Sequence, residues 1–263
     1  MDAKHLGICV VNMNIQTSIA AYRESSFVKL EGFFESTLLQ NIEKTVLKFH
    51  HHWLKENESF YQTRAINSAF LTKPGILTGV ERLQLFKLVA NNELVELANE
   101  ILGGSCQFMN TQLFFNPYNP EQKNYWHRDG QYHLNLEEQK QALQGAQVLH
   151  FRVPLRDEPG IEIVSGSHKH WDTVEEEQVR LERDGHHNFE DLSTGTEVPL
   201  KQGDLLIFNA MAIHRGLYGM DRLALDILYC DRDPQLLSIV DKEAMPCSSE
   251  LTLLKNQEVF KLP

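Results

Sequence analysis

The chain has 263 residues, of which 42% are hydrophobic and 23% are charged, and its formal net charge at pH 7 is −11. This length and composition are ordinary for a globular protein with one core, so we interpret residues 1–263 as a single domain. The negative charge argues against nonspecific binding to DNA or to an anionic membrane surface, and we expect neither nucleic acid nor membrane as a partner.

The cysteines and the N-terminal residues bear on the cellular compartment. The four cysteines are far apart and form no C-x-x-C pair, which favours reduced thiols over disulfides or a zinc knuckle. The apolar run over residues 6–21 is interrupted by amide side chains, so we do not interpret it as a signal peptide. No run approaches the roughly 20 apolar residues of a membrane span. We therefore expect a cytoplasmic protein.

Helical patterns dominate the N-terminal part, about residues 30–104, whereas residues 1–30 are compatible with a strand or an ordered arm. Apolar residues recur at three- and four-residue intervals over residues 36–57, which predicts a helix with Ser36 as its N-cap. Three adjacent histidines at 50–52 point in different directions on a helix, so we interpret them as a solvated face and not as a metal site.

A second helix is predicted over about residues 81–102, ended by two glycines. The pattern then changes to short strands separated by turn residues, with one short helix over about 136–144. Helices followed by many short strands predict a mainly β fold, a sandwich or barrel with flanking α-helices, over a core of about residues 105–232. The expected strands cover 107–116, the segment around 127–129, 147–155, 160–164, 205–209, 212–217 and 222–230.

An acidic and polar segment at about residues 171–200 interrupts the strand pattern. Gly185 and Gly195 lie within it, and its first part has helical character. We predict an inserted, mobile lid that becomes ordered when substrate binds.

The segment from Tyr125 to Gly130 contains the strongest chemical signal. Successive side chains of a strand point to opposite faces, so His127 and Asp129 would share one face. With His214 from another strand, they give two imidazoles and one carboxylate on one side of a metal. This is the ligand set of a non-haem Fe(II) oxygenase, which leaves other coordination positions open.

Several segments together resemble the phytanoyl-CoA dioxygenase family of Fe(II)/2-oxoglutarate oxygenases. They occur in the family's order over about residues 107–230, and the run Tyr-Trp-His-x-Asp is similar to the ectoine hydroxylase branch. The resemblance implies a double-stranded β-helix (jelly-roll, cupin-like) core, Fe(II), and 2-oxoglutarate and O₂ as co-substrates. The segments that carry it are His127-Arg128-Asp129, Gly160 to His168, Gly203 to Phe208 and His214-Arg215-Gly216, ending near Arg222.

The resemblance also implies residues for the co-substrate. A guanidinium can pair bidentately with the remote carboxylate of 2-oxoglutarate, and Arg222 is the candidate because it opens the strand after His214. Its spacing from His214 is shorter than the family usually shows, which leaves Arg215 as the alternative. The other interpretation of Arg222 is a surface ion pair without a role in the site. Asn110 and Gln112 share a strand face and are candidates for hydrogen bonds to the co-substrate, against ordinary core pairing.

Two departures from the family pattern direct attention to the substrate. Arg128 stands where Gln or Ser is frequent, and Arg152 stands where a Trp often lies beside the co-substrate. A buried Arg152 needs a partner, and we expect an anionic group of a small-molecule substrate. Three more residues close to the site in sequence are candidates for the substrate pocket, with core packing as the alternative: Tyr132, His133 and Trp171.

The retained carboxylate Asp129 favours hydroxylation, because related halogenases replace it with a small residue. The prediction is therefore a 2-oxoglutarate-dependent hydroxylase of a small metabolite. Two other classes stay open: a catalytically silent jelly-roll protein that binds a metal or ligand, and a zinc-dependent cupin-like hydrolase or isomerase. No feature of the sequence indicates an oligomeric state.

Overall fold

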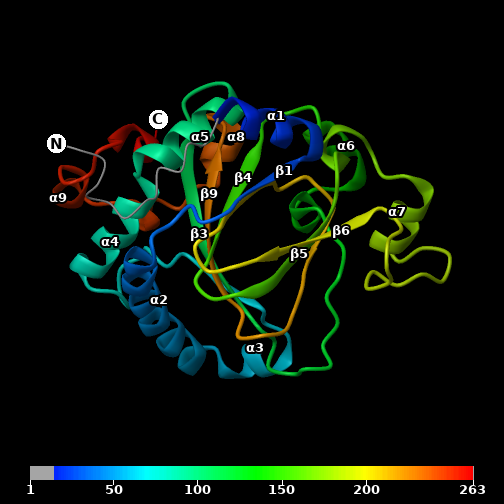
Figure 1. Ribbon diagram of the computed structural model, residues 1–263, viewed down its shortest axis with the longest axis horizontal. Helices are drawn as coiled ribbons and strands as arrows, with labels where there is room; N and C mark the ends of the chain where they lie inside the picture. Colours follow the sequence, from blue (N-terminus) through cyan, green and yellow to red (C-terminus); the bar gives the residue numbers. More distant parts are fainter. Residues whose placement is uncertain (1–14, 263) are drawn as a thin grey trace.

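The computed structural model describes residues 15–262, so most of the apolar run at residues 6–21 lies outside the described residues. Two antiparallel sheets form the centre of the molecule, one with the strand order β1-β7-β4-β9-β3-β2 and the other with the order β6-β5-β8. The expected jelly-roll core with flanking helices is confirmed (Figure 1). The strands are β1 (Phe27–Leu30), β2 (Asn67–Ala69), β3 (Gln107–Phe115), β4 (Val148–Pro154), β5 (Glu158–Val164), β6 (Gly195–Leu200), β7 (Leu205–Asn209), β8 (His214–Gly216) and β9 (Leu223–Cys230).

The helices gather mainly around the larger sheet, with α2 and α4 beside it and α7 at the far end of the molecule (Figure 1). None of the helices within residues 15–262 combines the length and apolar character that crossing a membrane requires. The α-helices are α1 (Ile15–Ser25), α2 (Ser36–Glu56), α3 (Glu58–Thr63), α4 (Gly79–Val89), α5 (Asn92–Leu102), α6 (Leu136–Ala142), α7 (Val174–Arg180), α8 (Pro234–Ser238) and α9 (Ser248–Leu251), and the 3₁₀ helices are η2 (Asp129–Tyr132), η3 (Ser167–Lys169), η4 (Lys242–Ala244) and η5 (Gln257–Phe260).

The helix expected at 81–102 is in fact two helices. Asn91 interrupts it: its side chain accepts hydrogen bonds from the backbone N–H groups of Glu93 and Leu94, at 2.9 and 3.2 Å. A side-chain acceptor at this position satisfies donors of a new first turn, so α5 starts here. In α2, Ser36 is the first helical residue and not the cap, which is Glu35.

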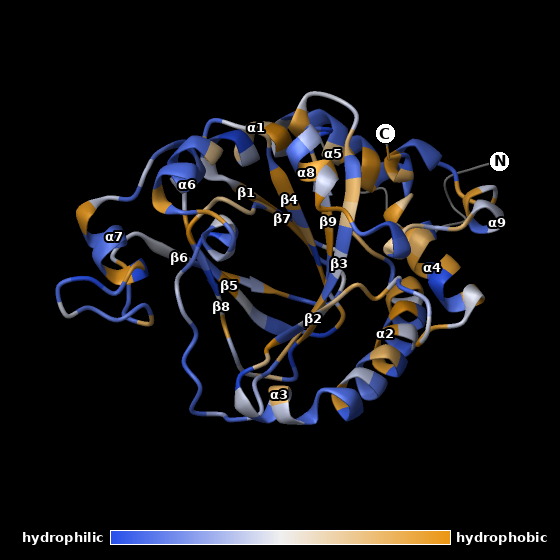
Figure 2. Cartoon of the chain, turned by 180° about the vertical axis from the view of Figure 1, so that it is seen from behind, coloured by the Kyte–Doolittle hydropathy of each residue, from blue (hydrophilic) through white to orange (hydrophobic). Residues whose placement is uncertain are grey.

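The two faces of the larger sheet have different chemistry. On β9, Leu223, Leu225, Ile227 and Tyr229 join the hydrophobic core that also contains buried side chains of α2, α4 and α5. The alternate face of β9 carries Asp226, which is fully buried. Figure 2 shows hydrophobic colours along strands of the larger sheet, such as β4, β7 and β9, and a largely hydrophilic segment around α7. Because helices cover one face, the polar face of this sheet points into the jelly roll.

The segment expected to be a lid is partly a structural strand. Residues 195–200 form β6, which pairs with β5, so Gly195 begins a strand and is not a hinge of a free loop. The loop before it is tied to Trp126, whose backbone N–H and indole N–H donate to carbonyls of Asn188 and Glu190, both at 2.8 Å. The sequence did not predict this strand, because the polar residues before Gly195 placed it within the polar insertion.

Within the described part of the chain, Cys106, Cys230 and Cys247 are free thiols, the first two buried and the third exposed.

Candidate active site

His127, Asp129 and His214 meet although only one of them belongs to a regular strand. His127 and His214 form an isolated antiparallel bridge, each backbone N–H donating to the other's carbonyl at 2.9 Å. Asp129 is the first residue of η2, and its N–H donates to the carbonyl of Ala210 at 3.0 Å. The expectation that His127 and Asp129 share a face of one strand is therefore corrected: a bridge and a 3₁₀ turn bring them together.

The three side chains form a compact set of ligand atoms. Asp129 Oδ1 lies 3.4 Å from His127 Nε2 and 3.7 Å from His214 Nε2. One ligand atom from each residue lies within 4.8 Å of the others. The His214 side chain is 7% exposed, whereas those of His127 and Asp129 are 16% and 32% exposed. The set is thus buried on the His214 side and accessible on the opposite side.

Backbone carbonyls orient both imidazoles. His127 Nδ1 lies 3.1 Å from the Tyr125 carbonyl, and His214 Nδ1 lies 3.0 Å from the Ala212 carbonyl. A carbonyl only accepts, so each Nδ1 carries the proton and each Nε2 presents its lone pair to the ligand set. Burial, assisted by the nearby His127, lowers the pKa of His214 to about 3, which keeps it in the neutral form that binds metals.

Charged groups hold Asp129 in its anionic form. Burial alone would raise the pKa of its carboxyl, but the charge of His150 and the hydrogen bond from His150 Nε2, at 2.7 Å, hold that pKa well below its usual range. Two neutral imidazoles and one carboxylate are the donor set of a non-haem Fe(II) site. The side chains present therefore fit the metal that the sequence predicted.

A chain of buried ion pairs runs from this set through the jelly roll. His150 and Arg152 project from β4 toward Asp226 on β9, and Arg152 and Asp226 are paired in register. Arg152 donates to both carboxylate oxygens of Glu158, at 2.7 and 3.0 Å, and to Asp226 Oδ1 at 3.1 Å. Sequence reasoning missed His150, Asp226 and Glu158. The available signal was a charged residue within each of two largely apolar strands, Arg152 in β4 and Asp226 in β9.

These contacts change the interpretation of Arg152. Its guanidinium is 1% exposed and neutralised by two carboxylates of the same chain. The anionic partner that a buried arginine requires is therefore supplied internally by Glu158 and Asp226. We assign Arg152 a structural role in place of the expected substrate contact.

The guanidinium of Arg222 has longer and fewer contacts with other protein groups than that of Arg152. It is 3% exposed, its Nε lies 3.5 Å from Glu158 Oε2, and its Nη1 donates to the Phe115 carbonyl at 3.4 Å. Among the described residues, Arg222 Nε has no hydrogen-bond partner. Burial and the neighbouring Arg152 lower the pKa of Arg222 to about 10, which still leaves it charged near neutral pH. A buried cation with such long contacts favours an additional anionic partner.

Gly216 makes room for this guanidinium. A Cβ atom at position 216 would lie 2.7 Å from Arg222 Nη2. Gly216 is two residues from His214 on β8, so both face the same side, about 6–7 Å apart along the strand. Arg222 therefore lies over the same face of β8 that carries His214, a candidate metal ligand.

Arg215, the alternative, points away. It donates from Nε to Glu162 at 2.7 Å and from Nη2 to Asp191 at 2.7 Å, and it lies over the ring of Trp126 at 4.5 Å. Alternation along β8 puts Arg215 on the face opposite His214. Its partners leave Arg222 as the better candidate for an anion beside the metal.

The comparison with protein families agrees with this geometry. A family model described as phytanoyl-CoA dioxygenase (PhyH) matches residues 22–217, more than half of the chain. The chain belongs to the phytanoyl-CoA dioxygenase family. It is a non-haem iron, 2-oxoglutarate-dependent enzyme, with Fe(II) as cofactor and 2-oxoglutarate as co-substrate. The family match ends before Arg222, so the case for Arg222 depends on the geometry above.

Solved structures share the fold at low sequence identity. HygX from Streptomyces hygroscopicus, with nickel and 2-oxoglutarate bound, has a TM-score of 0.59 and 16% identity, covering 81% of this chain and 86% of its own. EctD from S. alaskensis, with 2-oxoglutarate and 5-hydroxyectoine, has a TM-score of 0.56 and 14% identity, covering 84% and 77%. The carbocyclase SnoK from nogalamycin biosynthesis has a TM-score of 0.56 and 16% identity, covering 83% and 84%. No curated protein matches the chain.

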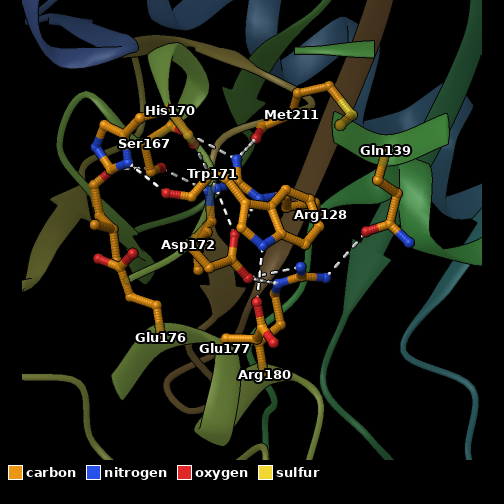
Figure 3. A network of polar contacts seen from close by, with 12 residues as sticks. Arg128, Gln139, Ser167, His170, Trp171, Asp172, Glu176, Glu177, Arg180 and Met211 are labelled. Carbon is orange, nitrogen blue, oxygen red and sulfur yellow. Dashed lines mark hydrogen bonds and ion pairs between the residues drawn. The ribbon is translucent and has the colours of Figure 1, made fainter. Parts of the chain in front are cut away.

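Arg128, between the candidate metal ligands His127 and Asp129 of this PhyH protein, is buried in a network of polar contacts (Figure 3). All five of its N–H donors are used: two bond to Asp172, at 3.0 and 2.8 Å, and three to the carbonyls of Ser167, His170 and Met211. Asp172 also binds Arg180, with 2.7 Å from Nε to Oδ2. The network joins residues 127–129, which we call the ligand segment, to the 167–172 turn and to α7. Arg128 is therefore not available to a substrate, contrary to the interpretation from the sequence.

The remaining predicted residues are spread more widely. Asn110 turns its carbonyl oxygen to the backbone N–H groups of Phe70 and Thr111, at 3.2 and 2.7 Å, which satisfies it locally. Gln112 is half-buried, pairs in register with Asp226 and faces the jelly-roll interior.

The predicted substrate residues also separate. The Tyr132 ring lies 5.7 Å from that of His127, beside the metal ligand, and its hydroxyl lies 3.0 Å from that of Tyr125. His133 is exposed. Trp171 donates its indole N–H to Glu177 at 2.8 Å, and the guanidinium of Arg180 faces its ring at 5.3 Å (Figure 3).

Proposed function

We propose that this enzyme hydroxylates a C–H bond of a small molecule, binding Fe(II) through His127, Asp129 and His214 and the remote carboxylate of 2-oxoglutarate through Arg222. One observation carries the proposal: an incompletely satisfied, buried guanidinium lies over the strand face that presents His214. Two residues of a strand span about 6–7 Å, a separation that a five-carbon diacid can bridge while its 2-oxo acid end chelates a metal.

The chain's own residues then have separate tasks. His127, Asp129 and His214 would hold the metal from one side and leave coordination positions open for a bidentate 2-oxo acid and for oxygen. When bound, Fe(II) with 2-oxoglutarate and O₂ supplies the oxidising chemistry that yields succinate and CO₂. Arg222 fixes the orientation of the co-substrate.

The substrate approaches, in this proposal, from the exposed side of the ligand set. Tyr125 and Tyr132 flank His127 there, with ring centroids at 5.3 and 5.7 Å from its ring. Their rings offer flat apolar surface, and their hydroxyls offer hydrogen bonds, which suits a small molecule that has a ring and polar groups. The expected anionic substrate group loses its support, because Arg128 and Arg152 are neutralised by Asp172, Glu158 and Asp226.

Hydroxylation is the outcome that the retained Asp129 supports over halogenation. Two proteins of similar fold, SnoN and SnoK, are described as an epimerase and a carbocyclase. An epimerisation or a ring closure is therefore the second candidate for the oxidative outcome. Product analysis separates these outcomes, because hydroxylation adds one oxygen atom and epimerisation leaves the mass unchanged.

The first experiment is anaerobic addition of Fe(II) and 2-oxoglutarate to the apo-protein, with the visible spectrum as readout and His127→Ala as control. A charge-transfer band in the wild type alone would support chelation of the 2-oxo acid at the metal, and a substrate screen by succinate release follows. Folded wild-type protein that binds iron without the band would refute the proposal, leaving a silent jelly-roll protein or a zinc enzyme.

A further inference from the structure

His150 lies between a metal ligand and a buried carboxylate. Its Nε2 is 2.7 Å from Asp129 Oδ2, and its Nδ1 is 3.0 Å from Asp226 Oδ2. The other oxygen of Asp129, Oδ1, is the one that lies 3.4 Å and 3.7 Å from the Nε2 atoms of His127 and His214. The two oxygens of Asp129 therefore have different partners: one faces the ligand set and the other faces His150.

The imidazole of His150 is held on several sides. It is 2% exposed and stacks on Phe208, with ring centroids 4.6 Å apart and an interplanar angle of 18°. Asp226, which holds its Nδ1 side, is itself held by Arg152 at 3.1 Å. Arg152 in turn is clamped by both oxygens of Glu158. A ring packed in this way has little freedom to rotate, so its Nε2 has a defined direction.

We propose that His150, oriented by Asp226, is a positioning residue that keeps Asp129 a one-oxygen ligand. Without His150, the Asp129 carboxylate is free to turn about its terminal torsion and to offer both oxygens to the metal. That would use a coordination position which the 2-oxo acid or oxygen needs. The inference rests on the metal assignment in the proposed function, and it adds a residue that contacts the ligand and not the metal.

Hydrogen-bond partners of metal ligands contribute strongly to metal binding. Removing such a partner typically weakens metal affinity about 10–100-fold. His150→Gln keeps a polar side chain but replaces the ring that Asp226 and Phe208 hold in place with a flexible amide. Asp226→Asn keeps the shape of the acid while removing the charge that orients the ring. His168→Gln is the matched control, because His168 is a half-buried histidine outside this chain of contacts.

The test uses Co(II) binding to the full-length apo-protein, because the visible spectrum of Co(II) reports coordination number without any turnover. We expect folded His150→Gln, checked by circular dichroism, to bind Co(II) about 10–100-fold more weakly than wild type and to change the intensity of the visible bands. Asp226→Asn is expected to change both quantities in the same direction by a smaller factor, and His168→Gln to leave them unchanged.

Three results would overturn the proposal. The first is folded His150→Gln with wild-type affinity and spectrum, which would make His150 a plain core residue. The second is a loss as large as that of His127→Ala, with a spectrum that has lost an imidazole ligand, which would make His150 a metal ligand itself. If His150→Gln does not fold, Asp226→Asn decides, and wild-type Co(II) binding in that variant is the third. Because Co(II) binding needs no 2-oxoglutarate, failure of the charge-transfer experiment is a separate result.

Discussion

The network around Arg128 makes a quantitative prediction for a conservative substitution. Arg128→Lys keeps the positive charge but replaces five N–H donors in a planar fork with three on one nitrogen. All five donors of Arg128 have partners, and its side chain is fully buried. At least two hydrogen bonds must therefore be lost, and the carbonyls that accepted them stay buried.

The expected loss follows from those bonds. At least two buried acceptors are left without a donor, and each costs about 1–3 kcal/mol. We expect Arg128→Lys to lower the free energy of unfolding by about 3 kcal/mol. Because Arg128 lies between His127 and Asp129, the variant should also bind Fe(II) or Co(II) more weakly.

Urea denaturation of the apo-protein measures the first quantity, and metal titration measures the second. Arg183→Lys is the control: Arg183 also pairs with a carboxylate, that of Glu177 in α7, but its side chain is 44% exposed. We expect a change of less than about 0.5 kcal/mol there. An Arg128→Lys variant as stable as Arg183→Lys would show that the network of Figure 3 does not hold the ligand segment.

Three further predictions concern single positions. Gly160 has φ +84°, and a Cβ there would lie 1.9 Å from the Val198 carbonyl oxygen, so Gly160→Ala should lower the free energy of unfolding by about 3 kcal/mol in urea denaturation. Gly216→Ala should change the free energy of unfolding by less than about 1 kcal/mol, because the new methyl group displaces only the end of the Arg222 side chain. It should weaken 2-oxoglutarate binding about tenfold. Unchanged binding would argue against Arg222 as the partner of the 2-oxoglutarate carboxylate. Of the three histidines expected on a solvated face, His50 is instead half-buried, with its ring centroid 4.5 Å from that of Phe115. Burial and the positive charge of its neighbours lower the pKa of His50 to about 4 from its ordinary 6.5. Below pH 6.5 the unfolded chain therefore binds a proton that the folded chain does not, and stability is lost as the pH falls from 6.5 toward 4. From pH 7 to pH 5 this amounts to about 2 kcal/mol, and His50→Gln should remove it from the pH dependence measured by denaturation.

The sequence by itself determined the chemistry of the metal set and the class of fold. His127 and Asp129 are local neighbours, so their convergence needed only an extended segment, and the strand and turn pattern around them predicted a jelly roll. The structure confirmed the fold and brought His214 to the pair. It also corrected the local reason, because a β-bridge and the start of η2, and not one regular strand, set the directions of the ligands.

Tertiary structure decided what the buried charges do. Arg128 and Arg152 read alike in the sequence, as cations close to the site, because nothing local shows where a long side chain finds its partner. One partner of each lies far along the chain: Asp172 is 44 residues from Arg128, and Asp226 is 74 residues from Arg152. Glu158 is only six residues from Arg152, but it lies on the next strand, β5, and only the fold shows that the two side chains meet. Only the register of β4 with β9 placed Asp226 beside His150, since a shift of one residue would turn it to the opposite face of the sheet.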